Sequence, residues 1–157
     1  EVTLDPLTSH ARLLLSPDGL EARWAYGGPE PSAGPERFTS APCVLGSPGF
    51  TSGRHTWTVN VAEAPFCAVG VSRESVPRQG PAAALGPAQG VWAVQRWGGL
   101  GRALTEPPAE LPRLPRRLRV ALDYEGGRVA FFDGDRSGST PIFAFPAAAF
   151  HGERLRP

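Results

Sequence analysis

Apolar and polar residues alternate most clearly between positions 118 and 133. The alternation covers residues 118–123 and resumes at 129–132, and Glu125, Gly126 and Gly127 stand between the two runs. A period of two is typical of a strand with one buried face, and two such runs joined by glycines predict a β-hairpin. Glycine favours the turn because it adopts positive φ without a steric cost. Since a lone hairpin is barely stable in water, we expect further strands elsewhere in the chain.

Shorter runs of strand-like sequence lie on both sides of this hairpin. They predict strands near residues 13–15, 21–26, 43–46, 50–61, 66–71, 91–97 and 142–145. The run 50–61 places Trp57 on a face that we expect to be buried. Segments rich in glycine and proline separate the runs, including an expected exposed loop at 27–35 and an expected turn at 98–102. Four prolines in 105–115 exclude that segment from the centre of a sheet.

The whole pattern indicates an all-β domain. About ten short strands, with turn signals every 8 to 12 residues or so and no helix of three turns, predict a two-sheet antiparallel β-sandwich with little or no helix. A length of 157 residues suits one domain with one core. The 19 Gly and 18 Pro favour many turns, while 41% hydrophobic residues supply enough apolar surface to order the chain.

The charge of the chain is nearly balanced, with 16 basic and 15 acidic residues. All of the basic residues are arginines, which a bias of composition explains most simply. A net charge of +1 argues against bulk attraction to nucleic acid or to an anionic membrane, because both need concentrated positive charge. Guanidinium groups nevertheless bind carboxylates and stack on aromatic rings.

The two cysteines, Cys43 and Cys67, each lie in an apolar run. We predict free thiols in the core rather than a disulfide, because so few cysteines do not make the framework of a secreted protein. This favours a reducing compartment. The sequence shows neither a signal peptide nor an apolar run of about 18 residues that would span a membrane. We therefore expect a cytoplasmic location.

No group of residues has the spacing of a catalytic or metal site. His10, His55 and His151 lie far apart, and none has a second ligand at the usual zinc spacing. Asp123 and Glu125 would share one face of a strand, but the turn that follows favours local hydrogen bonds to the backbone. We predict no metal, no cofactor and no enzymatic activity.

A candidate interface lies at the end of the run 91–97. Gln95, Arg96 and Trp97 precede a glycine-rich turn, and an aromatic residue beside a guanidinium is a composition favoured at protein interfaces. Trp97 capping the core explains the same pattern, and that alternative stays open. Tyr26, next to the loop 27–35, has the same two explanations.

Three blocks of sequence resemble a known family. They are VTLDPLTSHARLLLSPDG at 2–19, FTSGRHTWTVNV at 50–61 and LDYEGGRVAFFD at 122–133. Their order, and connecting pieces such as PERF, CVLG and GVW, resemble the PRY-SPRY (B30.2) domains of tripartite-motif ubiquitin ligases and butyrophilins. The resemblance covers essentially the whole chain. One departure is Thr58, where the second block of the family has Glu.

The resemblance implies one SPRY-like domain with a bent, concanavalin-like jelly-roll sandwich. Its PRY part would cover about residues 1–46 and its SPRY part about 47–157. The family normally continues for one or two strands beyond the position that matches Pro157. The resemblance therefore implies that the last strands are lacking here and that a sheet edge is uncovered.

The resemblance also implies a non-catalytic domain that binds a protein or peptide target for a tripartite-motif ubiquitin ligase. In relatives, the partner-facing surface includes the positions that match Ala68, Gln95 and Trp97. With Tyr26 and Arg96, these residues form our predicted partner-binding set. The resemblance implies no cofactor, no nucleic acid and no direct membrane contact by this domain. Any oligomerisation would involve other parts of the parent protein.

Two other functions fit parts of the resemblance. A butyrophilin-like ligand sensor would hold an anion near Arg102, although Ala68 replaces the histidine of the butyrophilins that bind phosphorylated isoprenoids. A secreted relative, like the venom proteins of the family, would need a signal peptide in the full gene.

Overall fold

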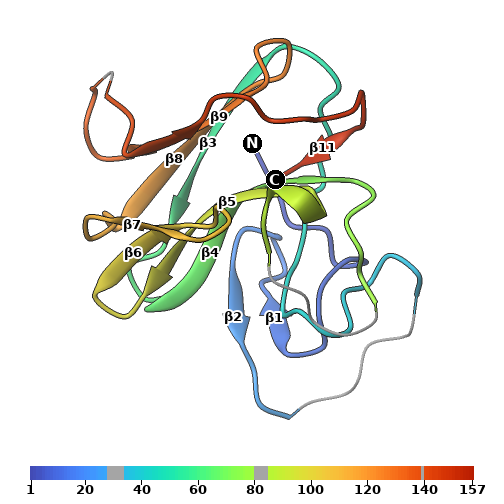
Figure 1. Ribbon diagram of the computed structural model, residues 1–157. Helices are drawn as coiled ribbons and strands as arrows, with labels where there is room; N and C mark the ends of the chain where they lie inside the picture. Colours follow the sequence, from blue (N-terminus) through green and yellow to red (C-terminus); the bar gives the residue numbers. More distant parts are fainter. Residues whose placement is uncertain (28–33, 80–84, 139) are drawn as a thin grey trace.

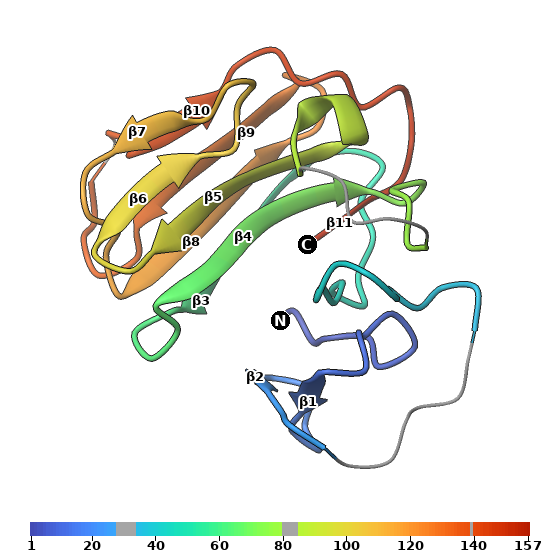
Figure 2. The same cartoon turned by 60° about the horizontal axis from the view of Figure 1, so that its bottom comes forward.

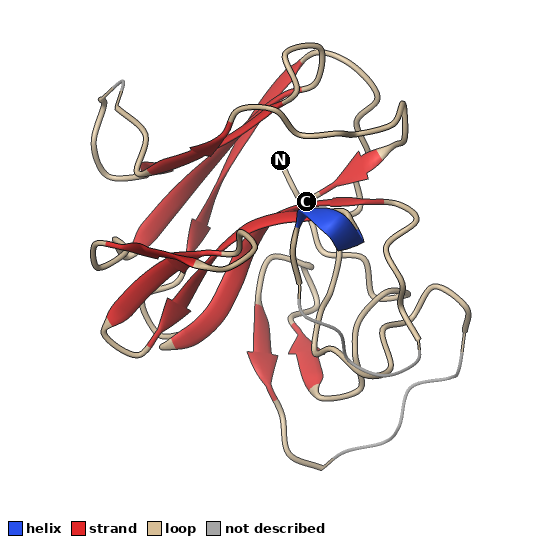
Figure 3. Cartoon of the chain, in the orientation of Figure 1, coloured by secondary structure: helices blue, strands red, loops and turns tan. Residues whose placement is uncertain are grey.

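The computed structural model describes residues 1–27, 34–79, 85–138 and 140–157. Within them, two antiparallel sheets pack against each other and a separate hairpin lies to one side (Figure 1). Figure 3 shows that strands dominate and that a single short helical turn, η1 (Pro87–Gln89), interrupts them in the described part of the chain. The predicted all-β sandwich is confirmed.

The strands form three groups. The four-stranded sheet has the order β10-β9-β8-β3, made of β3 (Arg54–Asn60), β8 (Arg117–Asp123), β9 (Arg128–Asp133) and β10 (Phe143–Phe145). The five-stranded sheet has the order β11-β4-β5-β6-β7, made of β4 (Phe66–Arg73), β5 (Val91–Trp97), β6 (Leu100–Ala103), β7 (Ala109–Leu111) and β11 (Leu155–Arg156). The separate hairpin pairs β1 (Leu13–Leu15) with β2 (Ala22–Trp24).

The main core lies between the two sheets, as the alternating pattern predicts. Val120 of β8 pairs with Phe131 of β9, and both side chains are fully buried. They belong to one cluster with Trp92 of β5, while Trp57 of β3 packs against that cluster. The predicted hairpin between β8 and β9 is therefore confirmed, and Gly127 in its turn has the expected positive φ of 61°.

A second, smaller core lies on the outer face of the five-stranded sheet. Val91 and Ala93 of β5 belong to it, and Phe38 and Leu45 from the N-terminal segment cover them. Figure 2 shows this segment, with β1 and β2, on the side of the five-stranded sheet that faces away from β8 and β9. The N-terminal segment thus covers one part of an outer sheet face.

Arg156 joins the N-terminal segment to the sheets. Its side chain is 6% exposed, its Nε donates to the carbonyl oxygen of Gly46 at 2.9 Å, and its Nη2 lies 2.8 Å from Asp5 Oδ2. Its Nη1 also lies 3.2 Å from Glu74 Oε2. One buried guanidinium therefore holds three parts of the chain that are far apart in sequence.

Two expected features of the fold are wrong. Residues 43–46 form no strand, because their backbone groups bond the N-terminal loop instead, as in the bond from Asp5 N to Leu45 O at 2.8 Å. The expected turn at 98–102 is mostly strand β6, which begins at Leu100 and pairs with β5. The expected loop at 27–35 lies largely outside the described residues. The proline-rich segment 105–115 supplies β7, which lies at a sheet edge as the prolines require.

Among the described residues, no helix has the length and apolar character needed to cross a bilayer.

Candidate functional site

Part of the outer face of the five-stranded sheet stays uncovered. Phe66 of β4 lies opposite Trp97 of β5, and Trp97 lies opposite Leu100 of β6. Directly opposite residues share one face of a sheet, so the three apolar side chains form a row across three strands. They are 66%, 51% and 68% exposed, respectively. This row lies at the other end of β5 from the part that the N-terminal segment covers.

A more polar row lies next to it on the same face. Ala68 lies opposite Gln95, Gln95 opposite Arg102, and Arg102 opposite Glu110 of β7. We define the outer-face patch as the seven residues of the two rows, which are Phe66, Ala68, Gln95, Trp97, Leu100, Arg102 and Glu110.

Contacts within the patch fix the orientation of its side chains. The Phe66 and Trp97 rings meet edge to face, with centroids 5.5 Å apart and planes at 87°. The Arg102 guanidinium carbon lies 5.1 Å from the centroid of the Trp97 ring, and Arg102 Nε donates to Gln95 Oε1 at 2.5 Å. Rigid, well-packed aromatic and arginine side chains lose little conformational entropy on binding, which is typical of the energetic centres of interfaces.

A tight turn sets this register. Gly98 and Gly99 join β5 to β6, and Gly98 has a φ of 61°, which glycine adopts without steric cost. The Gly98 amide donates to the carbonyl oxygen of Pro65 at 2.7 Å. The ends of β4, β5 and β6 are therefore held together beside the apolar row.

The structure gathers three of the five predicted binding residues into the patch, namely Ala68, Gln95 and Trp97. Tyr26 is 88% exposed and lies beyond β2, where its ring meets that of Trp24 with centroids 5.9 Å apart. Figure 2 shows β1 and β2 on the same side of the five-stranded sheet as its outer face. Tyr26 forms a second exposed aromatic pair with Trp24, next to a hairpin that is separate from the five-stranded sheet of the patch.

Arg96, the fifth predicted residue, stands apart. Successive residues of a strand point to opposite faces, so Arg96 lies on the inner side of β5 between Gln95 and Trp97. Its Nη1 donates to the carbonyl oxygen of Val61. The expectation that Arg96 lies with its neighbours on a partner-facing surface does not agree with this arrangement.

Sequence reasoning missed Phe66 and Leu100 as members of the site. The signal that identifies them is the pair Gly98-Gly99, because a two-residue turn after Trp97 places residue 100 opposite residue 97. The place of Phe66 beside them depends on the register of β4 against β5, which the sequence alone does not show.

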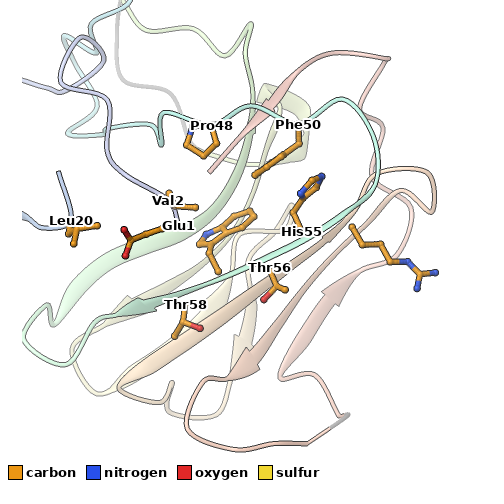
Figure 4. A pocket seen from close by; sticks show the side chains of 10 residues that line it. Glu1, Val2, Leu20, Pro48, Phe50, His55, Thr56 and Thr58 are labelled. Carbon is orange, nitrogen blue, oxygen red and sulfur yellow. The ribbon is translucent and has the colours of Figure 1, made fainter. Parts of the chain in front are cut away.

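A separate cavity of about 600 Å³ lies along β3 (Figure 4). Its wall includes Glu1, Phe50, Arg54 and His55. The His55 ring stacks on Phe50 with centroids 3.9 Å apart, and its Nε2 lies 2.7 Å from the carbonyl oxygen of Ser52. Because these contacts already engage the His55 ring, we assign no chemistry to this cavity.

Both cysteines are free, as predicted. Burial raises the pKa of Cys43 from its ordinary value of 9.0 to about 11, and burial also raises the pKa of Cys67. Both thiols therefore stay protonated near neutral pH and are poor nucleophiles.

Comparison with known proteins identifies two adjacent family domains. Residues 2–50 match the SPRY-associated domain, PRY, and residues 54–157 match the SPRY domain. RING finger protein 39 from Homo sapiens is 45% identical over 177 residues, and this chain covers 41% of its length. The E3 ubiquitin-protein ligase TRIM15 from Sus scrofa is 45% identical over 161 residues, and the chain covers 33% of its length.

Two solved structures share the fold. The TRIM65 PSpry domain has a TM-score of 0.81 at 24% identity, and the comparison covers 99% of this chain and 82% of that one. Stonustoxin also has a TM-score of 0.81, at 22% identity, and the comparison covers 99% of this chain and 25% of that one. The family matches cover nearly every residue of the sandwich and of the N-terminal segment that packs on it. The chain therefore belongs to the PRY-SPRY (B30.2) family.

Proposed function

We propose that this chain is the target-recognition domain of a longer protein, and that the outer-face patch contacts the target. PRY-SPRY domains are protein-binding modules without catalytic activity. One observation carries the assignment of the surface. Phe66, Trp97 and Leu100 form an apolar row, and each of the three is more than half exposed. The N-terminal segment covers another part of the same sheet face. Apolar residues gathered on a rigid surface are a mark of protein interaction sites.

We further propose that the parent protein is a RING-type ubiquitin ligase and that this domain selects its substrate. The names of the relatives support this, since they include a RING finger protein and an E3 ubiquitin-protein ligase. The chain spans less than half the length of these relatives, so the ligase activity would reside in another part of the parent. The butyrophilin alternative receives no support from these relatives.

The proposal is tested by capture of binding partners from a cell extract on the immobilised chain. Trp97→Ala removes the centre of the apolar row, and we expect it to weaken binding of each specific partner by about 2 kcal/mol or more, roughly 30-fold. Leu7→Ala is the matched control, because Leu7 is also 62% exposed but lies outside the patch. Quantitative mass spectrometry and then titration of each purified partner measure the effect.

The assignment fails if Phe66→Ala and Trp97→Ala together leave the affinity of every captured partner unchanged while circular dichroism shows an intact fold. An effect of Leu7→Ala as large as that of Trp97→Ala would place the interface elsewhere on the surface.

A further inference from the structure

Arg102 is held in one orientation by two contacts on the outer-face patch. Its Nε donates to Gln95 Oε1 at 2.5 Å, and its guanidinium plane lies over Trp97. The strand β6 fixes its backbone between β5 and β7. A guanidinium that is already oriented loses little conformational entropy when it binds a ligand.

These contacts leave the two terminal amino groups of Arg102 without a bond from the described residues. Several other arginines differ in this respect, since Arg78, Arg117 and Arg156 each pair with a carboxylate. Glu110 lies opposite Arg102 on β7, yet the two form no ion pair within 4.0 Å. The two terminal amino groups of Arg102 can therefore donate side by side to the two oxygens of one carboxylate.

We propose that the outer-face patch selects a peptide in which an acidic residue lies within two positions of a large apolar residue. This inference rests on the proposed function and names the chemistry of the target. The apolar residue packs on Phe66, Trp97 and Leu100, and the acidic residue binds the terminal amino groups of Arg102.

The spacing follows from the sheet. The backbones of the two rows are two residues apart along β4, β5 and β6, which is about 7 Å. Side chains at positions i and i+2 of an extended peptide have the same separation and point to the same side. Adjacent residues of a turn bring two side chains as close, so the acidic residue falls one or two positions from the apolar one.

The balance of charge favours a carboxylate over a phosphate group. The patch has one fixed guanidinium, and the Glu110 carboxylate on the neighbouring strand opposes a second negative charge. Phosphate groups carry up to two charges at neutral pH and are usually bound by clusters of arginines. A single carboxylate matches the single available cation.

The test begins with a library of random twelve-residue peptides displayed on phage and selected on the immobilised chain. We expect the enriched sequences to share an Asp or Glu within two positions of a Trp, Phe, Leu, Ile or Met. The best enriched peptide is then synthesised with a fluorescent label, together with a copy in which Asn or Gln replaces the acidic residue. Fluorescence anisotropy gives the dissociation constant of each peptide.

Four dissociation constants are measured, those of the acidic and the amide peptide with the wild-type chain and with Arg102→Gln. Together they isolate the contact between the acidic residue and Arg102. We expect Arg102→Gln to weaken the acidic peptide about tenfold and the amide peptide less than twofold. Arg54→Gln is the matched control, because Arg54 is 85% exposed and lies on the other sheet. It should leave both affinities unchanged.

The outcomes separate this inference from the proposed function. Enriched peptides without acidic residues, bound by the wild-type chain but not by Phe66→Ala, overturn the inference and leave the interaction surface in place. An equal loss of affinity for the acidic and the amide peptide in the Arg102→Gln variant also overturns the inference. Peptides that bind the Phe66→Ala variant as well as the wild type count against the surface itself, as does a selection without any enriched peptide.

Discussion

Phe66, Trp97 and Leu100 keep more than half of their surface in contact with water in the folded chain. Burial of apolar surface contributes about 25 cal/mol per Å², so folding leaves a large part of this free energy unused. A partner that covers the row gains it instead. The same exposure means that polar substitutions at Phe66 and Leu100 change stability little, because surface changes usually stay within about 0.5 kcal/mol. Binding and folding are thus separable at these positions.

Cys43 gives a prediction on the pH dependence of stability. Burial raises its pKa in the folded chain to about 11, above the ordinary value of 9.0 that applies when the chain is unfolded. Between these two values the folded chain keeps a proton that the unfolded chain has lost, so the free energy of unfolding falls as the pH rises. The slope from this one group is at most about 1.4 kcal/mol per pH unit. Urea denaturation at several pH values from 8 to 11 measures it.

The Cys43→Ala variant is the control for this prediction. It should lose less stability between pH 9 and 11 than the wild type does. The chain has no lysine, so no ammonium group of a side chain titrates in the same range, and Cys67 is present in both chains. Identical slopes for the two chains would show that another group controls alkaline unfolding.

At the scale of elements, β4 and β5 approach each other closely at Gly70. A Cβ atom at this position would meet the carbonyl oxygen of Trp92 and would lie 2.6 Å from Ala93 Cα. These are backbone atoms of the central strand, which cannot move aside as a flexible side chain would. We expect Gly70→Ala to lower the free energy of unfolding by about 2 kcal/mol, the usual range for overpacking.

Gly99→Ala is the matched control for Gly70, since a Cβ at Gly99 meets no atom within 4 Å. Thermal denaturation followed by tryptophan fluorescence compares the two variants with the wild type. A Gly70→Ala chain as stable as the Gly99→Ala chain would mean that the two strands separate at little cost.

The elements that sequence reasoning found are those whose burial alternates. In β8 the odd and even positions differ sharply in exposure, and the chemical difference between Val120 and Arg119 shows in the sequence. The strand β6 escaped prediction because Leu-Gly-Arg-Ala has no such contrast and is held as a strand by its long-range and local pairing with β7 and β5. The segment 43–46 is apolar enough for a strand, but its backbone groups are bonded to the loop around Asp5.

The outer-face patch was predicted only in part, because only some of its residues lie in one strand with a clear alternation. Gln95 and Trp97 lie in one clear strand, so their shared face follows from their spacing. The place of Phe66 in the patch depends on the pairing of β4 with β5, which is a long-range contact. Arg96 was predicted as a binding residue because it lies between Gln95 and Trp97 in the sequence. Side chains alternate along β5, so Arg96 lies on the inner face instead.

For the whole molecule, the buried Arg156 couples the N-terminal segment to the sandwich. Arg156→Ala removes its bonds to Asp5 and Glu74, which leaves Asp5 without its cation, while Glu74 keeps its pairs with Arg78 and Arg154. Breaking a fully buried pair costs about 3–5 kcal/mol. Because the side chains of Asp5 and Glu74 are 24% and 37% exposed, we expect a smaller loss in the free energy of unfolding, about 2–3 kcal/mol.

Urea denaturation of the Arg156→Ala chain measures this loss. Arg54→Ala is the control, because its pair with Asp123 at 3.6 Å is highly exposed on the arginine side and should contribute less than about 1 kcal/mol. Equal stabilities of the two variants would show that Arg156 is no more important than a surface charge.

The two ends of the described chain lie together, and this determines how the domain is presented. Val2 and Pro157 both lie against Gly46, and Figure 1 shows the N and C labels side by side. They lie near the end of β4 that pairs with β11 at Ser72 and Arg73. Phe66 begins the same strand, about 20 Å away at 3.4 Å per residue. A polypeptide attached at either end would therefore hold the domain from one point, and the apolar row would lie about 20 Å along β4 from that point.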